Sequence, residues 1–188
     1  MKNILRLMLM LFALSACVEK QKKIEDYEQV ESPLQLGKFI ANNGEFSMDL
    51  PGAWHKNEDA VDSDTMLYKL ETGPKMNNKG LCVLVVYKMN LMKGNMDHEF
   101  DWVMDNLLKK VSNAELIEKS TLTIGKMKAK TAHIAFMHDG KVLQEEIDIF
   151  IPINKKQYYY FGLVSDKNEQ TESNFGLMLQ CIKTFKLK

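Results

Sequence analysis

Between residues 95 and 184 the spacing of apolar residues changes twice, and this pattern constrains the fold more than any other feature. From Asn95 to Val111 the apolar residues recur every three or four positions, as on one side of an amphipathic helix. Another such helix is predicted over 171–184. Between the two helices lie four segments with strand patterns, 116–124, 128–137, 141–151 and 157–164. Helix, four strands and helix predict an antiparallel sheet packed by helices.

Three further strands are predicted before the first helix. Phe46, Met48 and Leu50 alternate with polar residues, and the Pro51-Gly52 pair ends that strand. Residues 65–70 form a second short strand, and 81–87 are apolar on both faces, which is typical of a central strand covered on both sides. The predicted class is therefore α+β, with an antiparallel sheet of about six to seven strands.

The N-terminus has the pattern of an export signal. Lys2 and Arg6 precede an apolar run, residues 7–14, that is too short to span a bilayer. The sequence Leu-Ser-Ala-Cys that ends at Cys17 resembles a bacterial lipobox. The resemblance implies that the Cys17 thiol carries a diacylglycerol anchor. It also implies a location in the cell envelope, and Val18 after the cysteine favours the outer membrane in a Gram-negative cell.

These features divide the chain into a signal peptide (1–16), a lipid-anchored polar tether (17–43) and one globular domain (44–188). The tether is predicted to contain one helical turn around Ile24 to Val30. Two cysteines follow the anchor, Cys82 and Cys181. They either pair in the oxidising envelope or lie buried as small hydrophobic residues.

Composition and motifs argue against several functions. Equal numbers of basic and acidic residues, 25 of each, argue against nucleic-acid binding, which requires a basic surface. The sequence contains no HExxH, CxxC or EF-hand pattern, no GxSxG and no phosphate-binding glycine loop. We therefore expect no enzymatic activity, no metal site and no cofactor.

One candidate binding site follows from the predicted hairpin of 128–151. A two-residue turn at Asp139-Gly140 would pair His133 with Glu146 and Thr131 with Asp148. One face of the hairpin would then carry a polar patch of Thr131, His133, Gln144, Glu146 and Asp148. In that arrangement Glu146 would raise the pKa of His133. The alternative is that these residues are simply the solvent side of the sheet, stabilised by cross-strand pairs.

Three short motifs resemble those of PsbP-like and DcrB-like domains. They are the strand that ends in Pro-Gly and a tryptophan (46–54), the aromatic strand Tyr158–Phe161, and the helix end at 182–186. The resemblance covers about 43–188. It implies an α/β/α sandwich, a fold that occurs in many bacterial lipoproteins. It also implies a binding or assembly module without a shared active site.

Three functional hypotheses remain open. The leading one is a membrane-anchored, non-enzymatic binding or assembly module with a protein partner in the envelope. The second is a small-ligand or metal-binding lipoprotein that uses the polar patch on the 128–151 hairpin. The third is an envelope enzyme whose catalytic residues converge only in three dimensions.

Overall fold

The computed structural model describes residues 22–30, 34–61, 63–74, 80–111 and 113–188. Their centre is an antiparallel seven-stranded sheet with the order β3-β4-β5-β9-β8-β7-β6. In chain order these strands are β3 (His55–Ala60), β4 (Met66–Gly73), β5 (Cys82–Asn90), β6 (Glu115–Ile124), β7 (Met127–His138), β8 (Val142–Pro152) and β9 (Gln157–Asp166). The predicted antiparallel α+β architecture is confirmed.

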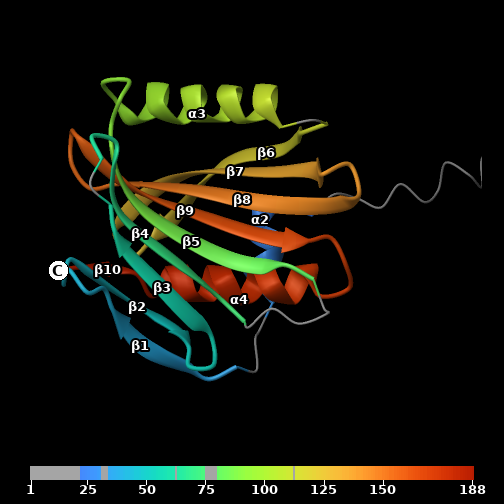
Figure 1. The fold of residues 1–188 in the computed structure, drawn as a ribbon, viewed down its shortest axis with the longest axis horizontal. Coiled ribbons are helices and arrows are strands. Elements are labelled where there is room, and N and C mark those ends of the chain that lie inside the picture. The colour runs from blue at the N-terminus through green and yellow to red at the C-terminus, as the bar shows by residue number, and fades with distance from the viewer. Residues whose placement is uncertain (1–21, 31–33, 62, 75–79, 112) are drawn as a thin grey trace, which may run out of the picture.

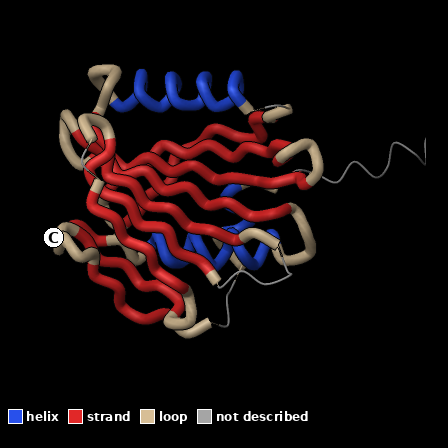
Figure 2. Tube along the Cα trace, in the orientation of Figure 1, coloured by secondary structure: helices blue, strands red, loops and turns tan. Residues whose placement is uncertain are grey.

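Helices cover both faces of this sheet (Figures 1 and 2). Helix α3 (Met96–Lys110) lies on one face, and α4 (Thr171–Lys183) with the short α2 (Ile24–Tyr27) lies on the other. A second sheet of three strands packs on the α4 side and consists of β1 (Leu36–Ile40), β2 (Phe46–Pro51) and β10 (Lys186–Leu187). Among the described residues, none of the helices is long and apolar enough to span a bilayer.

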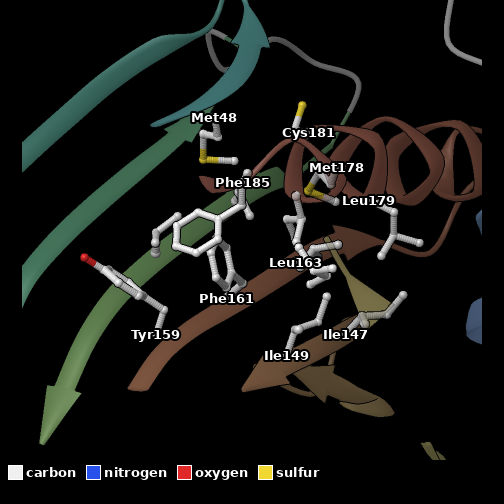
Figure 3. Close-up of a cluster of buried hydrophobic side chains, with 14 of the residues drawn as sticks. Met48, Ile147, Ile149, Tyr159, Phe161, Leu163, Met178, Leu179, Cys181 and Phe185 are labelled. Carbon is white, nitrogen blue, oxygen red and sulfur yellow. The ribbon is translucent and has the colours of Figure 1, made fainter. Parts of the chain in front are cut away.

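The main hydrophobic core lies between the large sheet and α4 (Figure 3). Alternate residues of β8 and β9 point into it, and they meet α4 and the aromatic ring of Phe185. Phe161 and Phe185 contact edge to face with ring centroids 5.1 Å apart. Cys82 and Cys181 are free thiols buried in this core, and burial raises their pKa values to about 11 and about 12. They therefore behave as small hydrophobic residues.

Helix α3 packs more lightly on the opposite face. Asn95 caps it, because the Asn95 side chain accepts a hydrogen bond of 2.9 Å from the backbone N–H of His98. Phe100 packs against Phe150 of β8 with ring centroids 5.2 Å apart. Ion pairs join the helix to Lys119 of β6 and Lys130 of β7. The described contacts of α3 thus lie with β6, β7 and β8 and, through Tyr158, with β9.

The predicted tether is folded onto the domain. Ile24 and Tyr27 of α2 are each only 3% exposed, and β1 forms a ladder with β2. The backbone N–H of Ile24 donates to Glu118 of β6 at 2.9 Å, and the Gln180 amide of α4 donates to the Val30 carbonyl at 2.6 Å. The domain therefore begins by residue 22, and the predicted boundary between 43 and 44 is wrong. The predicted signal peptide and Cys17 lie outside the described residues.

Gly176 of α4 allows this N-terminal segment to dock closely. A Cβ atom at Gly176 would lie 2.7 Å from Val30 Cβ and 3.0 Å from the Val30 carbonyl oxygen. Carbon atoms in contact need roughly 3.5–4.0 Å. A side chain at position 176 would therefore separate the segment from α4.

Candidate functional site

The β7–β8 hairpin has the predicted turn but a different register. Asp139 and Gly140 adopt positive φ angles of 49° and 66°, as a type I′ turn requires, and Lys141 N–H donates to the His138 carbonyl at 3.0 Å. Lys141 is an extra residue, however, so that His138 pairs with Val142. His133 therefore lies opposite Ile147 rather than Glu146, and the predicted pairing is wrong by one residue.

This shift divides the predicted polar patch between the two faces of the sheet, because a one-residue slip reverses every side chain. Thr131 and His133 point toward α4, and His133 meets the Phe175 ring edge-on at 6.0 Å. The opposite face, which α3 covers, carries Gln144, Glu146 and Asp148 together with Phe150. The alternative prediction, that these residues form the solvent side of the sheet, is also wrong. Four of the five are buried, and Glu146 is partly buried.

On the α4 side, the buried partner of His133 is Glu145. One Glu145 carboxylate oxygen lies 3.3 Å from His133 Nε2 and accepts a 3.3 Å hydrogen bond from the Tyr27 hydroxyl. The other oxygen pairs with Lys167 Nζ at 2.8 Å. Burial raises the pKa of Glu145, but the His133 and Lys167 hydrogen bonds outweigh burial and lower this pKa to about 2. Glu145, which pairs with Lys167, therefore helps to hold α2 on the domain through the Tyr27 hydroxyl.

Two of the remaining predicted residues have structural partners. The Thr131 hydroxyl lies 2.7 Å from the Ser120 hydroxyl of β6. The Gln144 amide donates to Asp166 at 2.8 Å, and Asp166 also accepts the Leu81 backbone N–H at 2.8 Å. These contacts hold neighbouring strands and the start of β5 in place.

On the α3 side, three residues form what we call the acid–tyrosine cluster: Glu146, Asp148 and Tyr160. The Tyr160 hydroxyl contacts Asp148 Oδ1 closely and lies 3.0 Å from Glu146 Oε1. One hydroxyl proton can serve only one of these oxygens at a time. Asp148 is fully buried, and its Oδ2 has no hydrogen-bond partner among the described residues.

The glycine at position 162 makes room for this cluster. Gly162 pairs with Asp148 across β8 and β9. A Cβ atom there would lie 2.9 Å from the Tyr160 hydroxyl oxygen and 3.2 Å from Glu146 Oε1. It would also lie 2.8 Å from a Val85 methyl carbon. Without a side chain at 162, the Tyr160 hydroxyl can lie between the two carboxyl groups.

The two carboxyl groups lack a compensating cation. None of the ion pairs among the described residues includes Glu146 or Asp148. Burial raises the pKa of both groups, and the nearby Glu146 charge raises that of Asp148 further. Burial and the two acids also raise the pKa of Tyr160 far above its usual range. Both shifts favour the form in which the two acids keep one proton between them.

A partly buried surface of β5 and β9 lies beside the cluster, and Tyr160 joins it to the hydrophobic residues that pack with α3. We call it the open sheet surface, and its residues are Val83, Val85, Tyr87, Tyr160 and Val164. Tyr87 stacks on Tyr160 at 5.7 Å with an interplanar angle of 18°. On the opposite face of β5, Leu84 and Val86 are fully buried. The aromatic strand thus sends Tyr159 and Phe161 into the main core, whereas Tyr158 and Tyr160 lie on the α3 face.

Within the described part of the chain, no three His, Cys, Asp or Glu side chains converge as metal ligands would. Tyr160, Tyr87 and Gly162 were not among the predicted site residues. Of these three, only Tyr160 lies in the aromatic run 158–161, and that run does not indicate where the acids lie.

Comparison with known proteins identifies the fold. No protein-family model matches the chain, and no curated protein sequence matches it. The solution structure of PsbP (CyanoP) from the cyanobacterium Synechocystis sp. PCC 6803 aligns with a TM-score of 0.57 at 10% identity, covering 84% of this chain and 95% of that one. The Ran-binding protein Mog1p of Saccharomyces cerevisiae aligns with a TM-score of 0.56 at 10% identity, covering 82% and 96%.

A third structure comes from a cell-envelope context. LpqN of Mycobacterium tuberculosis, described as involved in cell envelope biogenesis, aligns with a TM-score of 0.51 at 13% identity and covers 89% of this chain and 98% of its own. Identities this low establish the fold alone. The expected PsbP-like sandwich is confirmed.

Proposed function

We propose that this chain is an envelope lipoprotein, anchored through Cys17, whose domain is a non-enzymatic binding or assembly module. Its binding face is the open sheet surface above the acid–tyrosine cluster. The observation that supports this most is the uncompensated acid pair, Glu146 and Asp148. Buried acids without a cation lower the stability of a fold, so their presence beside a partly exposed surface indicates a functional role.

The folded N-terminal segment supports a position close to the membrane. Five peptide steps separate Cys17 from Lys22, the first described residue. Even a fully extended chain spans at most about 3.6 Å per residue, or roughly 18 Å over this stretch. A lipidated Cys17 would therefore hold the domain against the headgroup region. The outer membrane remains our preferred location in a Gram-negative cell because Val18 follows the cysteine.

The fold relatives are compatible with a binding role. Mog1p is described as a Ran-binding protein, and LpqN as involved in cell envelope biogenesis. The alternative of ligand binding by the five-residue hairpin patch has lost its basis, because those residues lie on two faces of the sheet. We therefore favour a protein partner that meets the open sheet surface.

Site-specific photo-crosslinking in cells tests this proposal. A photoreactive residue at Lys69, which lies beside Tyr87 on β4, should crosslink to a discrete envelope protein. The same residue at the exposed Lys38 of β1, on the other side of the sandwich, should not. The Cys17→Ala variant should lose the product made from position 69, because it removes the anchor.

The proposal requires that the partner contacts position 69 and not position 38. Identical products from positions 69 and 38, or no product from position 69, would contradict the open sheet surface as the binding face. A product from position 69 that persists at full yield in Cys17→Ala would contradict the role of the anchor.

A further inference from the structure

We propose that the acid–tyrosine cluster binds the ammonium group of a lysine side chain from the partner protein, and that binding displaces the proton shared by Glu146 and Asp148 into solvent. This inference rests on the proposed function and names the chemistry that the binding face recognises. The ammonium group brings one positive charge, and the shared proton leaves to water. The site thus changes from a neutral acid beside a carboxylate to two carboxylates that face a cation.

The acid–tyrosine cluster lacks a positive charge among the described residues. The cluster contains two carboxyl groups and a phenol, and apart from the proton that it can share with Glu146, the buried Asp148 Oδ2 has no donor among the described residues. A native fold normally supplies a partner to such an atom. Glu146, the half-exposed member, is the one that an incoming group contacts first, and Asp148 adds the second negative charge behind it.

No cation lies directly opposite either acid on the neighbouring strands, and Lys130 of β7 pairs with Asp97 of α3 at 2.5 Å. Asp148 lies between Ala132 of β7 and Gly162 of β9, and Glu146 lies between Ile134 and Val164. None of these four side chains can ionise. On β5 the neighbours are Val85 and the Tyr87 phenol.

The charged residues next to these strands are already engaged. Lys69 of β4 lies opposite Tyr87 of β5, where its charge opposes the rise in the pKa of Tyr87. Lys69 also pairs with Glu71 at 3.5 Å. Glu99 of α3 accepts the backbone N–H groups of Met92 and Lys93 and the Tyr158 hydroxyl. No cation among the described residues compensates the cluster, so we assign the missing positive charge to the partner.

The open sheet surface is apolar and aromatic around the cluster. Half-buried valines and the stacked rings of Tyr87 and Tyr160 suit the apolar stem of a lysine, because such stems pack on apolar surface while the charge reaches a polar group. Aromatic faces also attract a cation.

A small probe tests the inference directly. We would titrate n-butylammonium chloride into the whole, detergent-solubilised chain and follow the backbone amide signals of Val85 and Gly162 by NMR. The probe stays charged at both pH 6 and pH 8, since alkylamines ionise near pH 10. We expect saturable shifts and at least fivefold tighter binding at pH 8, because release of one proton changes affinity by at most about tenfold per pH unit.

Matched variants assign the effect to the cluster. Asp148→Asn keeps the shape of the side chain and should abolish the pH dependence and weaken binding at pH 8 at least fivefold. Asp105→Asn removes an exposed acid of α3 outside the cluster and should change neither. n-Butanol, which matches the probe without its charge, should give only linear shifts.

Other outcomes overturn the inference. Linear shifts with the ammonium probe, equal affinity at both pH values, or unchanged binding by Asp148→Asn would each do so. If crosslinking from position 69 persists in that case, the proposed function stands and only the lysine recognition fails. If the crosslink is also absent, both proposals fail.

Discussion

Replacing Asp148 with Asn should raise the free energy of unfolding at pH 8 by about 1–3 kcal/mol, the usual range for relieving an unsatisfied buried polar group. Burial and the neighbouring Glu146 raise the pKa of Asp148 in the folded state well above its unfolded value near 4. A carboxyl group with a raised folded pKa stabilises the fold fully below its unfolded pKa, and this stabilisation is lost as the pH rises through the folded pKa. The native domain should therefore become less stable from pH 5 to pH 8.

Urea unfolding across this pH range checks the prediction. The native chain should lose stability steadily as the pH rises, whereas Asp148→Asn should show a much flatter profile. Glu145 acts in the opposite sense, since its lowered pKa makes its contribution disappear only as the pH falls from about 4.5 toward about 2. A variant that is less stable than the native chain at pH 8 would show that Asp148 is an ordinary, satisfied hydrogen-bonding group.

Replacing Tyr27 with Ala should lower the free energy of unfolding by about 3 kcal/mol or more, as for other buried aromatic residues. The Tyr27 ring is 3% exposed and packs against His133 at 5.7 Å and Phe175 at 5.1 Å. Its hydroxyl donates to Glu145. Loss of the ring removes the main contact between α2 and the core, and leaves Glu145 with one partner fewer.

Two other variants separate packing from the hydrogen bond in this prediction. Tyr27→Phe keeps the ring and should cost only about 1 kcal/mol. Glu25→Ala, exposed on the same helical turn, should be close to neutral. Chemical denaturation of the three variants provides the measurement. If Tyr27→Ala unfolds at the same denaturant concentration as Glu25→Ala, the N-terminal segment is a tether after all.

Long periodic segments were predictable from the sequence because burial determines their spacing. The helix that ends at Lys110 and the strands around 127–166 follow their predicted ranges to within a few residues. The shorter elements have weaker signals. β3 is an edge strand of mostly polar residues, and α2 is a single turn whose two apolar residues, Ile24 and Tyr27, are too few to indicate a periodicity.

The candidate site was harder to predict because it depends on the register. The Asp139-Gly140 turn was identified, but the added Lys141 moved Glu146 and Asp148 to the face opposite His133. A period of two makes such a slip decisive. The position of Tyr160 between the acids also depends on Gly162, a close approach that only the three-dimensional structure reveals.

The most direct test of the account is a pH titration of the Glu146 and Asp148 carboxyl carbons by NMR, in the native chain without ligand. The account predicts that the pair retains one proton at neutral pH and releases it well above the ordinary carboxyl range near 4. Two carboxyl groups that both ionise near pH 4 would contradict it, because a pair that is already fully charged has a compensating partner and no shared proton to release.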